Sequence, residues 1–364
     1  RIAVSMQCDD WEAFVTLLNQ HRSIVSHHFA QIVAHDDEQD DKEADLVWLD
    51  LWHGELNEEA ARDFLEQYPC AGESAVRERI DTFRESRPVT NMQQIGRERL
   101  EALMPSLLEQ VWAQDNTEET LGRIIPLLEA VLRRTAYLVL LSENPQALEQ
   151  LIKLCSASSW VAEFITRTPL LLDELLVPES LYRLPDQSEL QEELHLRLLR
   201  IEADDLEQQM EQMRQFVRAH KLRAAACEVM NKLPLMKISD YLTRLAETTM
   251  TMVQNLAFEQ MVAKYGYPTD ANKEPVYTPE FLIVGYGKVG GLELSYSSDL
   301  DLVFIHNGHA GGYTTGERSL DNGVFYTRMG QRMVHFCSTQ TRSGDLYEVD
   351  LRLRPSGNSG MIVA

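Results

Sequence analysis

The sequence has few cysteines, no long apolar run and a shortage of basic residues. Its five cysteines are scattered singly, without a CxxC pair, in a chain of 364 residues that is large enough to bury sizeable cores. We therefore expect buried free thiols rather than disulfides or a structural zinc site, and a cytoplasmic location. No apolar stretch approaches the roughly 18 residues of a membrane helix, so we expect no membrane partner.

The shortage of basic residues is large, with 34 lysines and arginines against 57 acidic residues and a formal net charge of −23. This balance argues against a nucleic-acid partner, because binding a phosphate backbone requires clustered lysine and arginine. A phosphate-bearing substrate would therefore have to be small and held locally through a metal. Hydrophobic residues make up 44% of the sequence, which argues against global disorder.

The sequence pattern changes along the chain. Residues 1–34 show helical spacing, and the acidic run at residues 36–41 repels itself and predicts a solvated linker. Residues 46–190 carry further helical patterns broken by proline and glycine. A long amphipathic helix is then predicted, because four apolar residues recur at intervals of three and four and form one stripe: Leu206, Met210, Met213 and Val217. Methionines in such a stripe are more typical of core packing than of a metal or haem site.

The pattern after Pro275 is typical of strands. Residues 281–284 form a short apolar run that ends in glycine, and residues 300–305 and 346–353 alternate between apolar and charged side chains. Residues 325–337 between them suit a helix. The last 90 residues therefore predict a mixed α/β unit that follows an all-helical region.

The segment Gly285–Gly290 fits the pattern G-x-G-x-x-G after a predicted strand. A dinucleotide-binding fold would need a helix directly after these glycines and an acidic residue about 20 positions further on. We expect no helix there, because residues 293–298 lead into another strand that carries two acids. The dinucleotide interpretation is therefore the weaker one.

The two acids are Asp299 and Asp301, which project on one face because side chains two apart in a strand point the same way. Alone, such a pair is typical of a solvated strand edge. Asp350 adds a third carboxylate among apolar neighbours, where a lone charge would be costly. Three such carboxylates on adjacent strands suit two Mg²⁺ ions in phosphoryl transfer. The backbone amides of Gly290 and Gly291 suit a triphosphate.

These motifs resemble a known family. The segments Gly287–Phe304 and Tyr347–Gly357 are similar to the signature of the bifunctional glutamine synthetase adenylyltransferase/adenylyl-removing enzymes, within the nucleotidyltransferase superfamily. Arg134–Leu138 and Leu170–Leu176 are similar to the helical middle of that family. The resemblance covers essentially the whole chain. Val289 departs from it, because the family usually has leucine there, and this is a packing change.

The resemblance implies an α+β fold with a mostly helical N-terminal and central region and a mixed-sheet, polymerase-β-like nucleotidyltransferase core. We expect residues 1–38 to be the end of a preceding deadenylylating half, and residues 39–195 a central regulatory region. Residues 196–274 would then lead into a catalytic core at residues 275–364, truncated at its C-terminus. The chain opens with Arg1, so we expect it to be a piece of a longer protein.

The activity that the resemblance implies is Mg²⁺-dependent transfer of AMP from ATP to a tyrosine of glutamine synthetase, with release of pyrophosphate. The implied metal ligands and catalytic residues are Asp299, Asp301 and Asp350. The implied nucleotide-binding residues are Gly290, Gly291, Ser298, Lys288, Arg352 and Arg354. For the arginines, outward salt bridges are an equal alternative, and Ser298 is equally suited to capping the turn before the strand.

The resemblance also implies partners: glutamine synthetase as protein substrate, a PII signal protein, and glutamine as effector. Three other functions stay open. The chain is alternatively a regulatory module that docks PII and glutamine synthetase, or it carries the phosphorolytic adenylyl-removing activity of the same family. A nicotinamide-dependent oxidoreductase is the third and weakest alternative. The ten histidines show no zinc-hydrolase spacing.

Overall fold

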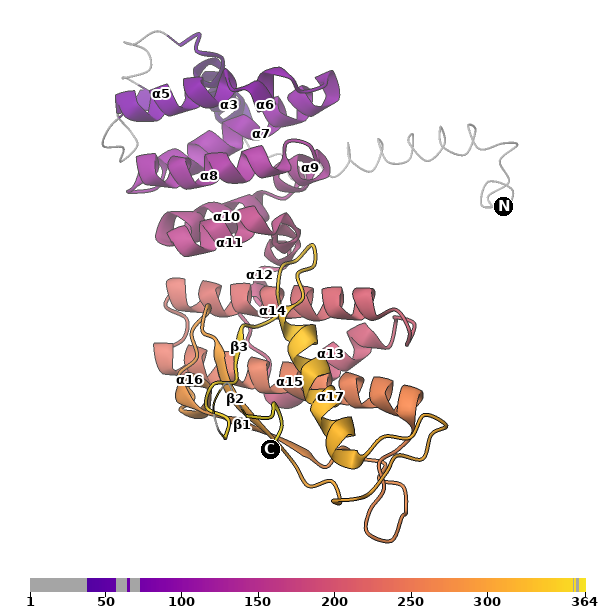
Figure 1. The fold of residues 1–364 in the computed structure, drawn as a ribbon. Coiled ribbons are helices and arrows are strands. Elements are labelled where there is room, and N and C mark those ends of the chain that lie inside the picture. The colour runs from indigo at the N-terminus through magenta and orange to yellow at the C-terminus, as the bar shows by residue number, and fades with distance from the viewer. Residues whose placement is uncertain (1–37, 57–63, 66–72, 356, 358–359) are drawn as a thin grey trace, which may run out of the picture. The chain divides into compact units, whose positions relative to one another are not determined.

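The computed structural model describes residues 38–56, 64–65, 73–355, 357 and 360–364. The chain divides into two compact units, one that ends at Asp115 and one that comprises Asn116–Ala364. Most described residues are helical, and a small sheet lies near the C-terminal end (Figure 1). The predicted α+β class is confirmed. The helix expected at residues 1–34 lies outside the described residues.

The first unit contains α3 (Glu38–His53), α5 (Glu73–Arg84), α6 (Arg87–Thr90) and α7 (Gln94–Trp112). Helices α3 and α7 pack together through Trp48 and Trp112, which are both fully buried with ring centroids 5.5 Å apart. The prediction of a linker over residues 36–41 is wrong from Glu38 onward, because α3 begins there. Acidic residues are favourable at a helix N-terminus, which offsets the repulsion within the run.

The second unit begins with a layer of short helices. Helix α8 packs against both α10 and α11, and their buried faces are made mainly of leucine, isoleucine and valine. The elements in this layer and the connection after it are α8 (Thr117–Val131), α9 (Ala136–Glu143), α10 (Pro145–Ala157), α11 (Ser159–Arg167), η1 (Pro169–Leu175), α12 (Pro178–Leu181) and α13 (Gln187–Leu198).

Two long helices, α14 (Leu206–Val229) and α15 (Leu235–Tyr265), follow and lie side by side (Figure 1). The predicted apolar stripe is confirmed, because Met210, Met213 and Val217 are buried and Leu206 packs at the edge of the same core. Helix α15 ends at Gly266, whose φ of +77° is accessible to glycine, and an added Cβ would lie 2.2 Å from the Gly316 nitrogen.

The sheet has the order β1-β2-β3, with β1 (Phe281–Gly285), β2 (Leu300–His306) and β3 (Val349–Asp350). Strands β1 and β2 are antiparallel, and β2 and β3 are parallel with Asp301 paired to Asp350. Helix α17 (Asn322–Ser338) connects the two parallel strands, as parallel pairing requires. The predictions of the first two strands and of this helix are confirmed.

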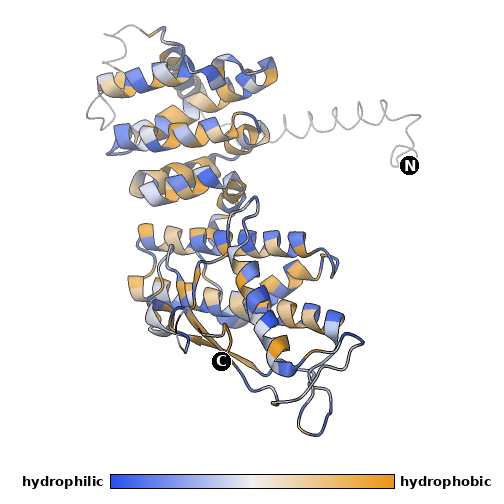
Figure 2. Ribbon diagram, in the orientation of Figure 1, coloured by the Kyte–Doolittle hydropathy of each residue, from blue (hydrophilic) through white to orange (hydrophobic). Residues whose placement is uncertain are grey.

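The sheet is supported by α15 and α17. Phe304 on β2 is buried with Phe325 and Met333 of α17, and Met250 of α15 belongs to the same core. Figure 2 shows hydrophobic residues along β1 and β2, whereas the helices carry both hydrophobic and hydrophilic segments. Asp299 and Asp301 lie at the start of β2, and the buried residues later in the same strand, such as Phe304, fix its position.

Candidate active site

Three aspartates meet at one point of the sheet. Asp299 directly precedes β2, Asp301 lies on β2 and Asp350 lies beside it on β3. Each is half-buried and offers one carboxylate oxygen, and these three oxygens lie within 4.8 Å of one another. The structure thus brings together the three carboxylates that the sequence singled out. Like charges at such distances repel unless a cation lies among them.

Asp350 is held by Arg352. The Arg352 backbone nitrogen donates to Asp350 Oδ1 at 2.8 Å, and Nε of Arg352 donates to Oδ2 at 2.7 Å. This hydrogen-bonded guanidinium holds the pKa of the Asp350 carboxyl below its usual range. The side chain of Arg352 is 74% exposed, whereas that of Asp350 is 13% exposed. Arg352 therefore pairs with Asp350 from an exposed position.

The strand predicted over residues 346–353 is much shorter in the structure, where only Val349 and Asp350 pair with β2. The prediction was wrong at the C-terminal end because the amide of Arg352 is satisfied by the side chain of Asp350 instead of by a neighbouring strand. Such local side-chain bonds compete with sheet pairing.

The glycine-rich turn after β1 lies against the same carboxylates. Gly287 has a φ of +54°, and a Cβ added there would lie 2.3 Å from Asp301 Oδ2. The Tyr286 amide donates to the Asp301 carbonyl at 2.8 Å. Only glycine therefore fits at position 287. The glycine repeat in the sequence was the available signal for this constraint, but it did not single out Gly287 as a site residue.

One helical turn, α16 (Gly287–Gly290), lies within the glycine segment, and no helix follows it before β2, as expected. It ends within four residues, and Leu292 then takes a φ of +59° as the chain turns toward β2. A dinucleotide fold needs a crossover to a parallel strand. Here β2 runs antiparallel to β1, so the topology contradicts the dinucleotide interpretation.

The comparisons with known proteins agree with this geometry. A family model described as Glutamate-ammonia ligase adenylyltransferase matches residues 148–364, which include the glycine turn and all three aspartates. The chain belongs to this family. Two of the most similar relatives, from Hahella chejuensis and Pseudomonas aeruginosa, are each 48% identical over the whole chain. A relative from Thioalkalivibrio sulfidiphilus is 43% identical.

All three relatives are named bifunctional glutamine synthetase adenylyltransferase/adenylyl-removing enzyme. The chain spans 38% of the length of each of them. Membership of the Glutamate-ammonia ligase adenylyltransferase family therefore establishes the kind of nucleotidyltransferase core that the chain contains. The activities in the relatives' names belong to longer proteins.

The donor set in this adenylyltransferase-family core fits a hard divalent cation. Asp299, Asp301 and Asp350 supply carboxylate oxygens only, which are the ligands that Mg²⁺ prefers. Within the described residues, this is the one group of three or more acidic, histidine or cysteine side chains close enough to share an ion. Each of the three aspartates is half-buried, so the cluster is partly exposed to solvent.

The other residues predicted to bind the nucleotide are arranged less uniformly. Lys288 and Gly291 are exposed in the glycine turn. The predicted use of the Gly290 and Gly291 amides for a triphosphate is not supported, because these amides already donate to the Tyr286 and Gly287 carbonyls at 3.1 and 3.0 Å. The Ser298 hydroxyl accepts from the Ser295 amide at 3.1 Å, the capping geometry that was its alternative. Arg354 donates to the Leu351 carbonyl at 2.7 Å.

The loop before Asp299 is anchored by helices α11 and α14. Lys221 of α14 donates to the Tyr296 carbonyl at 2.7 Å, and the Tyr296 hydroxyl donates to Glu228 of the same helix. Trp160 of α11 packs on the Tyr296 ring. Burial lowers the pKa of Lys221 to about 8 and, with the adjacent Glu228, raises that of Tyr296.

The sequence analysis did not identify these anchors. Lys221 lies four residues beyond Val217, on the continuation of the apolar stripe, and a lysine at that position was the available signal. Its partner is 75 residues away along the chain. No local pattern shows such a contact, because it depends on how α14 packs against the core.

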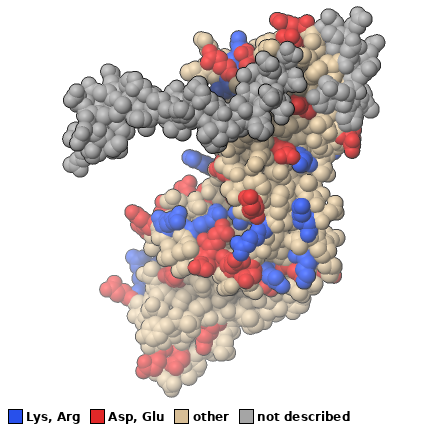
Figure 3. Space-filling view, turned by 180° about the vertical axis from the view of Figure 1, so that it is seen from behind, with Lys and Arg blue, Asp and Glu red and all other residues tan. Residues whose placement is uncertain are grey.

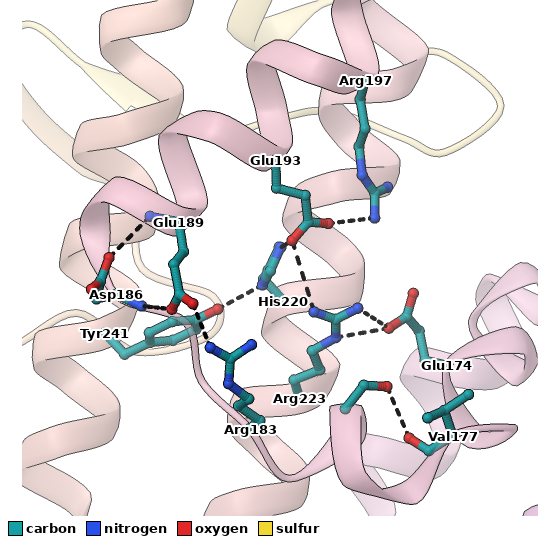
Figure 4. Close-up of polar contacts among 11 residues, drawn as sticks. Glu174, Val177, Arg183, Asp186, Glu189, Glu193, Arg197, His220, Arg223 and Tyr241 are labelled. Carbon is teal, nitrogen blue, oxygen red and sulfur yellow. Dashed lines mark hydrogen bonds and ion pairs between the residues drawn. The ribbon is translucent and has the colours of Figure 1, made fainter.

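A polar network ties α13 to α14 (Figure 4). His220 is buried, and its Nδ1 shares a hydrogen bond of 2.6 Å with the Tyr241 hydroxyl. Its Nε2 lies 3.3 Å from Oε2 of Glu193. Arg197 donates to Glu193 at 2.6 Å, and Arg223 pairs with Glu174 at 2.7 Å. Burial alone would raise the pKa of Glu193, but His220 and the two arginines lower it to about 2.

Among the described residues, no helix is long and apolar enough to cross a membrane. The cysteines that the structure describes, Cys155, Cys227 and Cys337, are free and buried. The expectation of buried free thiols is confirmed for these three.

Proposed function

We propose that this core transfers AMP from ATP to a tyrosine hydroxyl of glutamine synthetase, as one activity of a longer cytoplasmic enzyme. The observation that carries the proposal is the meeting of Asp299, Asp301 and Asp350 beside the Gly287 turn in a chain of the Glutamate-ammonia ligase adenylyltransferase family. Adenylyl transfer needs this combination, because a triphosphate and the oxygen that attacks it must be held in line.

In this proposal the three aspartates hold two Mg²⁺ ions. Bound ions supply charge neutralisation for the triphosphate and for the departing pyrophosphate. Gly287 leaves space for the Asp301 carboxylate beside the position of the phosphates. Lys288 and Arg352, both exposed at the edge of the cluster, neutralise further phosphate charge.

The transfer step conserves bonds and charge. The tyrosine oxygen forms a bond to the α-phosphorus, the bond from that phosphorus to the bridging oxygen breaks, and pyrophosphate leaves with the electron pair. The tyrosine proton passes to Asp350, which is ionised at neutral pH because the ordinary pKa of an aspartate, about 4, already lies well below 7. A tyrosine of ordinary pKa near 10 needs such an acceptor.

We assign addition rather than removal of AMP because a long helical region precedes the described aspartate pair. This order resembles the second half of the family's two-part architecture. The alternative, phosphorolytic removal, uses the same cluster on adenylylated glutamine synthetase and phosphate. The two are separated by supplying the protein with MgATP and unmodified glutamine synthetase, or with phosphate and the adenylylated form, and following the intact mass of glutamine synthetase.

We expect AMP to be added in the first mixture and retained in the second. Asp301→Asn should abolish the mass change, whereas Asp204→Asn, at an exposed position outside the cluster, should preserve it. Removal of AMP in the second mixture without addition in the first would contradict the proposed direction.

We further propose that the helices before the core carry the regulatory input, from PII and glutamine, that the family resemblance implies. The supporting observation is that α11 and α14 hold the loop before Asp299 through Trp160 and Lys221. A docking module alone would not need these contacts. Calorimetric titration of the protein with PII tests this role, and the absence of heat with every nucleotide-bound state of PII would contradict it.

A further inference from the structure

A second, strongly basic site lies in the same unit as the sheet. A cavity of about 740 Å³ is lined by four arginines, Arg133, Arg134, Arg167 and Arg342, and by one acid, Glu211. The four arginines are exposed. None of the three aspartates lines this cavity.

The charge of this cavity wall is unusual for the protein. The chain has a formal net charge of −23, and on the face shown in Figure 3 acidic and basic side chains are largely interleaved. In the cavity the single acid, Glu211, already accepts from the Ser343 hydroxyl at 2.6 Å. Arg167 pairs with Glu163 at 3.0 Å, but both are exposed, and such pairs are weak. The wall therefore keeps an excess of positive charge.

The arginines come from three separate segments. Arg133 and Arg134 follow the C-terminal end of α8, and Arg167 is the last residue of α11. Basic residues are favoured at helix C-termini, which explains three of the four. Arg342 lies instead in a turn after α17, where no helix end explains its charge.

The turn that carries Arg342 is fixed in place. Thr341 and Gly344 exchange two backbone hydrogen bonds of 3.0 Å. Buried Arg214 donates to the Gly344 carbonyl at 2.8 Å and to the Phe336 carbonyl at 2.8 Å. The cavity wall around Arg342 is therefore preorganised, which lowers the entropy cost of binding a ligand.

We propose that this cavity binds a small organic anion that carries several phosphate groups. Guanidinium groups bind phosphate oxygens in pairs, and four of them match several negative charges. The volume suits a nucleotide-sized ligand, and the side chains of Tyr137 and Leu170 line the wall for its organic part. A ligand here contacts Arg133 and Arg134 after α8, Arg167 at the end of α11, and Arg342. Arg342 lies eight residues before Asp350 (350 − 342), in the segment that leads to β3, so the ligand bridges the helices to that segment.

The test is calorimetric titration of the protein with inorganic tripolyphosphate in EDTA, which removes metal-dependent binding at the aspartates. We expect one saturable site, and an affinity at least tenfold weaker in Arg133→Gln/Arg342→Gln. Arg318→Gln changes an exposed arginine that does not line the cavity, and should leave the affinity unchanged. Asp301→Asn should also leave it unchanged, which separates this site from the proposed active site.

A titration with citrate distinguishes phosphate from other anions. We expect citrate to bind at least tenfold more weakly than tripolyphosphate, and equal affinity would overturn the assignment to phosphate. Absence of saturable tripolyphosphate binding at millimolar concentration, or binding that the paired arginine substitutions do not weaken, would overturn the site itself. Circular dichroism of each variant shows whether the fold is intact.

Discussion

The rings of Trp160 and Tyr296 pack at a tilt of 31° with their centroids 4.6 Å apart, and this contact joins α11 to the loop that leads into Asp299. Because Tyr296 is also held by Lys221 and Glu228 of α14, the position of the first aspartate depends on helices far away in the sequence. Helices α11 and α14 are thus part of the scaffold of the site.

Replacing this ring tests the connection. Trp160→Ala removes an aromatic pair worth about 0.5–1.5 kcal/mol, so the loop should move more freely and AMP transfer should fall about two- to tenfold. Trp160→Phe keeps a ring and should restore most of the rate. Steady-state kinetics measure both. An unchanged rate in Trp160→Ala, in a protein that melts like the parent, would show that the loop does not need this contact.

Gly287→Ala tests the close approach of the glycine turn to Asp301. The new Cβ would lie 2.3 Å from Asp301 Oδ2, so the carboxylate must move, and a displacement of this size costs about a hundredfold in rate. Gly311→Ala is the matched control, because Gly311 has a φ of +78° with nothing within 4 Å of an added Cβ.

Both alanine variants should lose about 1–2 kcal/mol of stability, since each places a side chain at positive φ. Only the variant at position 287 should lose activity. Equal activity losses in the two variants would mean that backbone strain, and not the contact with Asp301, limits the enzyme.

Much of this site was predictable from local patterns. The alternation around Asp301 required a strand with one polar face, and the apolar neighbours of Asp350 indicated another strand. The length of β3 was not predictable, because it is set by the bond from Arg352 to the Asp350 side chain. Neither was the start of α3, where helix formation overrides repulsion within an acidic run. Contacts such as Lys221 with Tyr296 depend on tertiary packing.

Glu193 should make the stability of the second unit depend on pH. Its pKa falls from an ordinary value of 4.5 to about 2 in the folded protein. The folded-state pKa is depressed, so its contribution is fully present above pH 4.5 and is lost as the pH falls toward about 2. Glu193→Gln should therefore flatten the dependence of the melting temperature on pH in that window.

The same substitution should lower stability at neutral pH by about 1–3 kcal/mol, because it leaves Arg197 and His220 with a weaker partner. Glu149→Gln, which changes an exposed acid paired with Lys153, is the control and should have little effect. Melting curves of the three proteins from pH 2 to 7 measure both effects. Parallel curves for the parent and Glu193→Gln would contradict the assignment.

The buried cysteines should be unreactive in the folded protein. Burial raises the pKa of Cys155 and Cys337 to about 12 and that of Cys227 to about 11, so almost no thiolate is present at pH 8. Iodoacetamide should label none of the three in the native protein and all of them after unfolding, as peptide mass spectrometry can show. Fast native labelling of Cys155 would contradict its burial.

The central claim is that Asp299, Asp301 and Asp350 bind divalent cations together. Calorimetric titration of Mn²⁺ into the protein with a non-hydrolysable ATP analogue measures this directly, using Asp299→Asn, Asp301→Asn and Asp350→Asn beside Asp204→Asn as control. We predict that each cluster variant weakens Mn²⁺ binding at least tenfold while the control binds like the parent. Parent-like Mn²⁺ affinity in Asp350→Asn would contradict the claim, because the third carboxylate would then hold no metal.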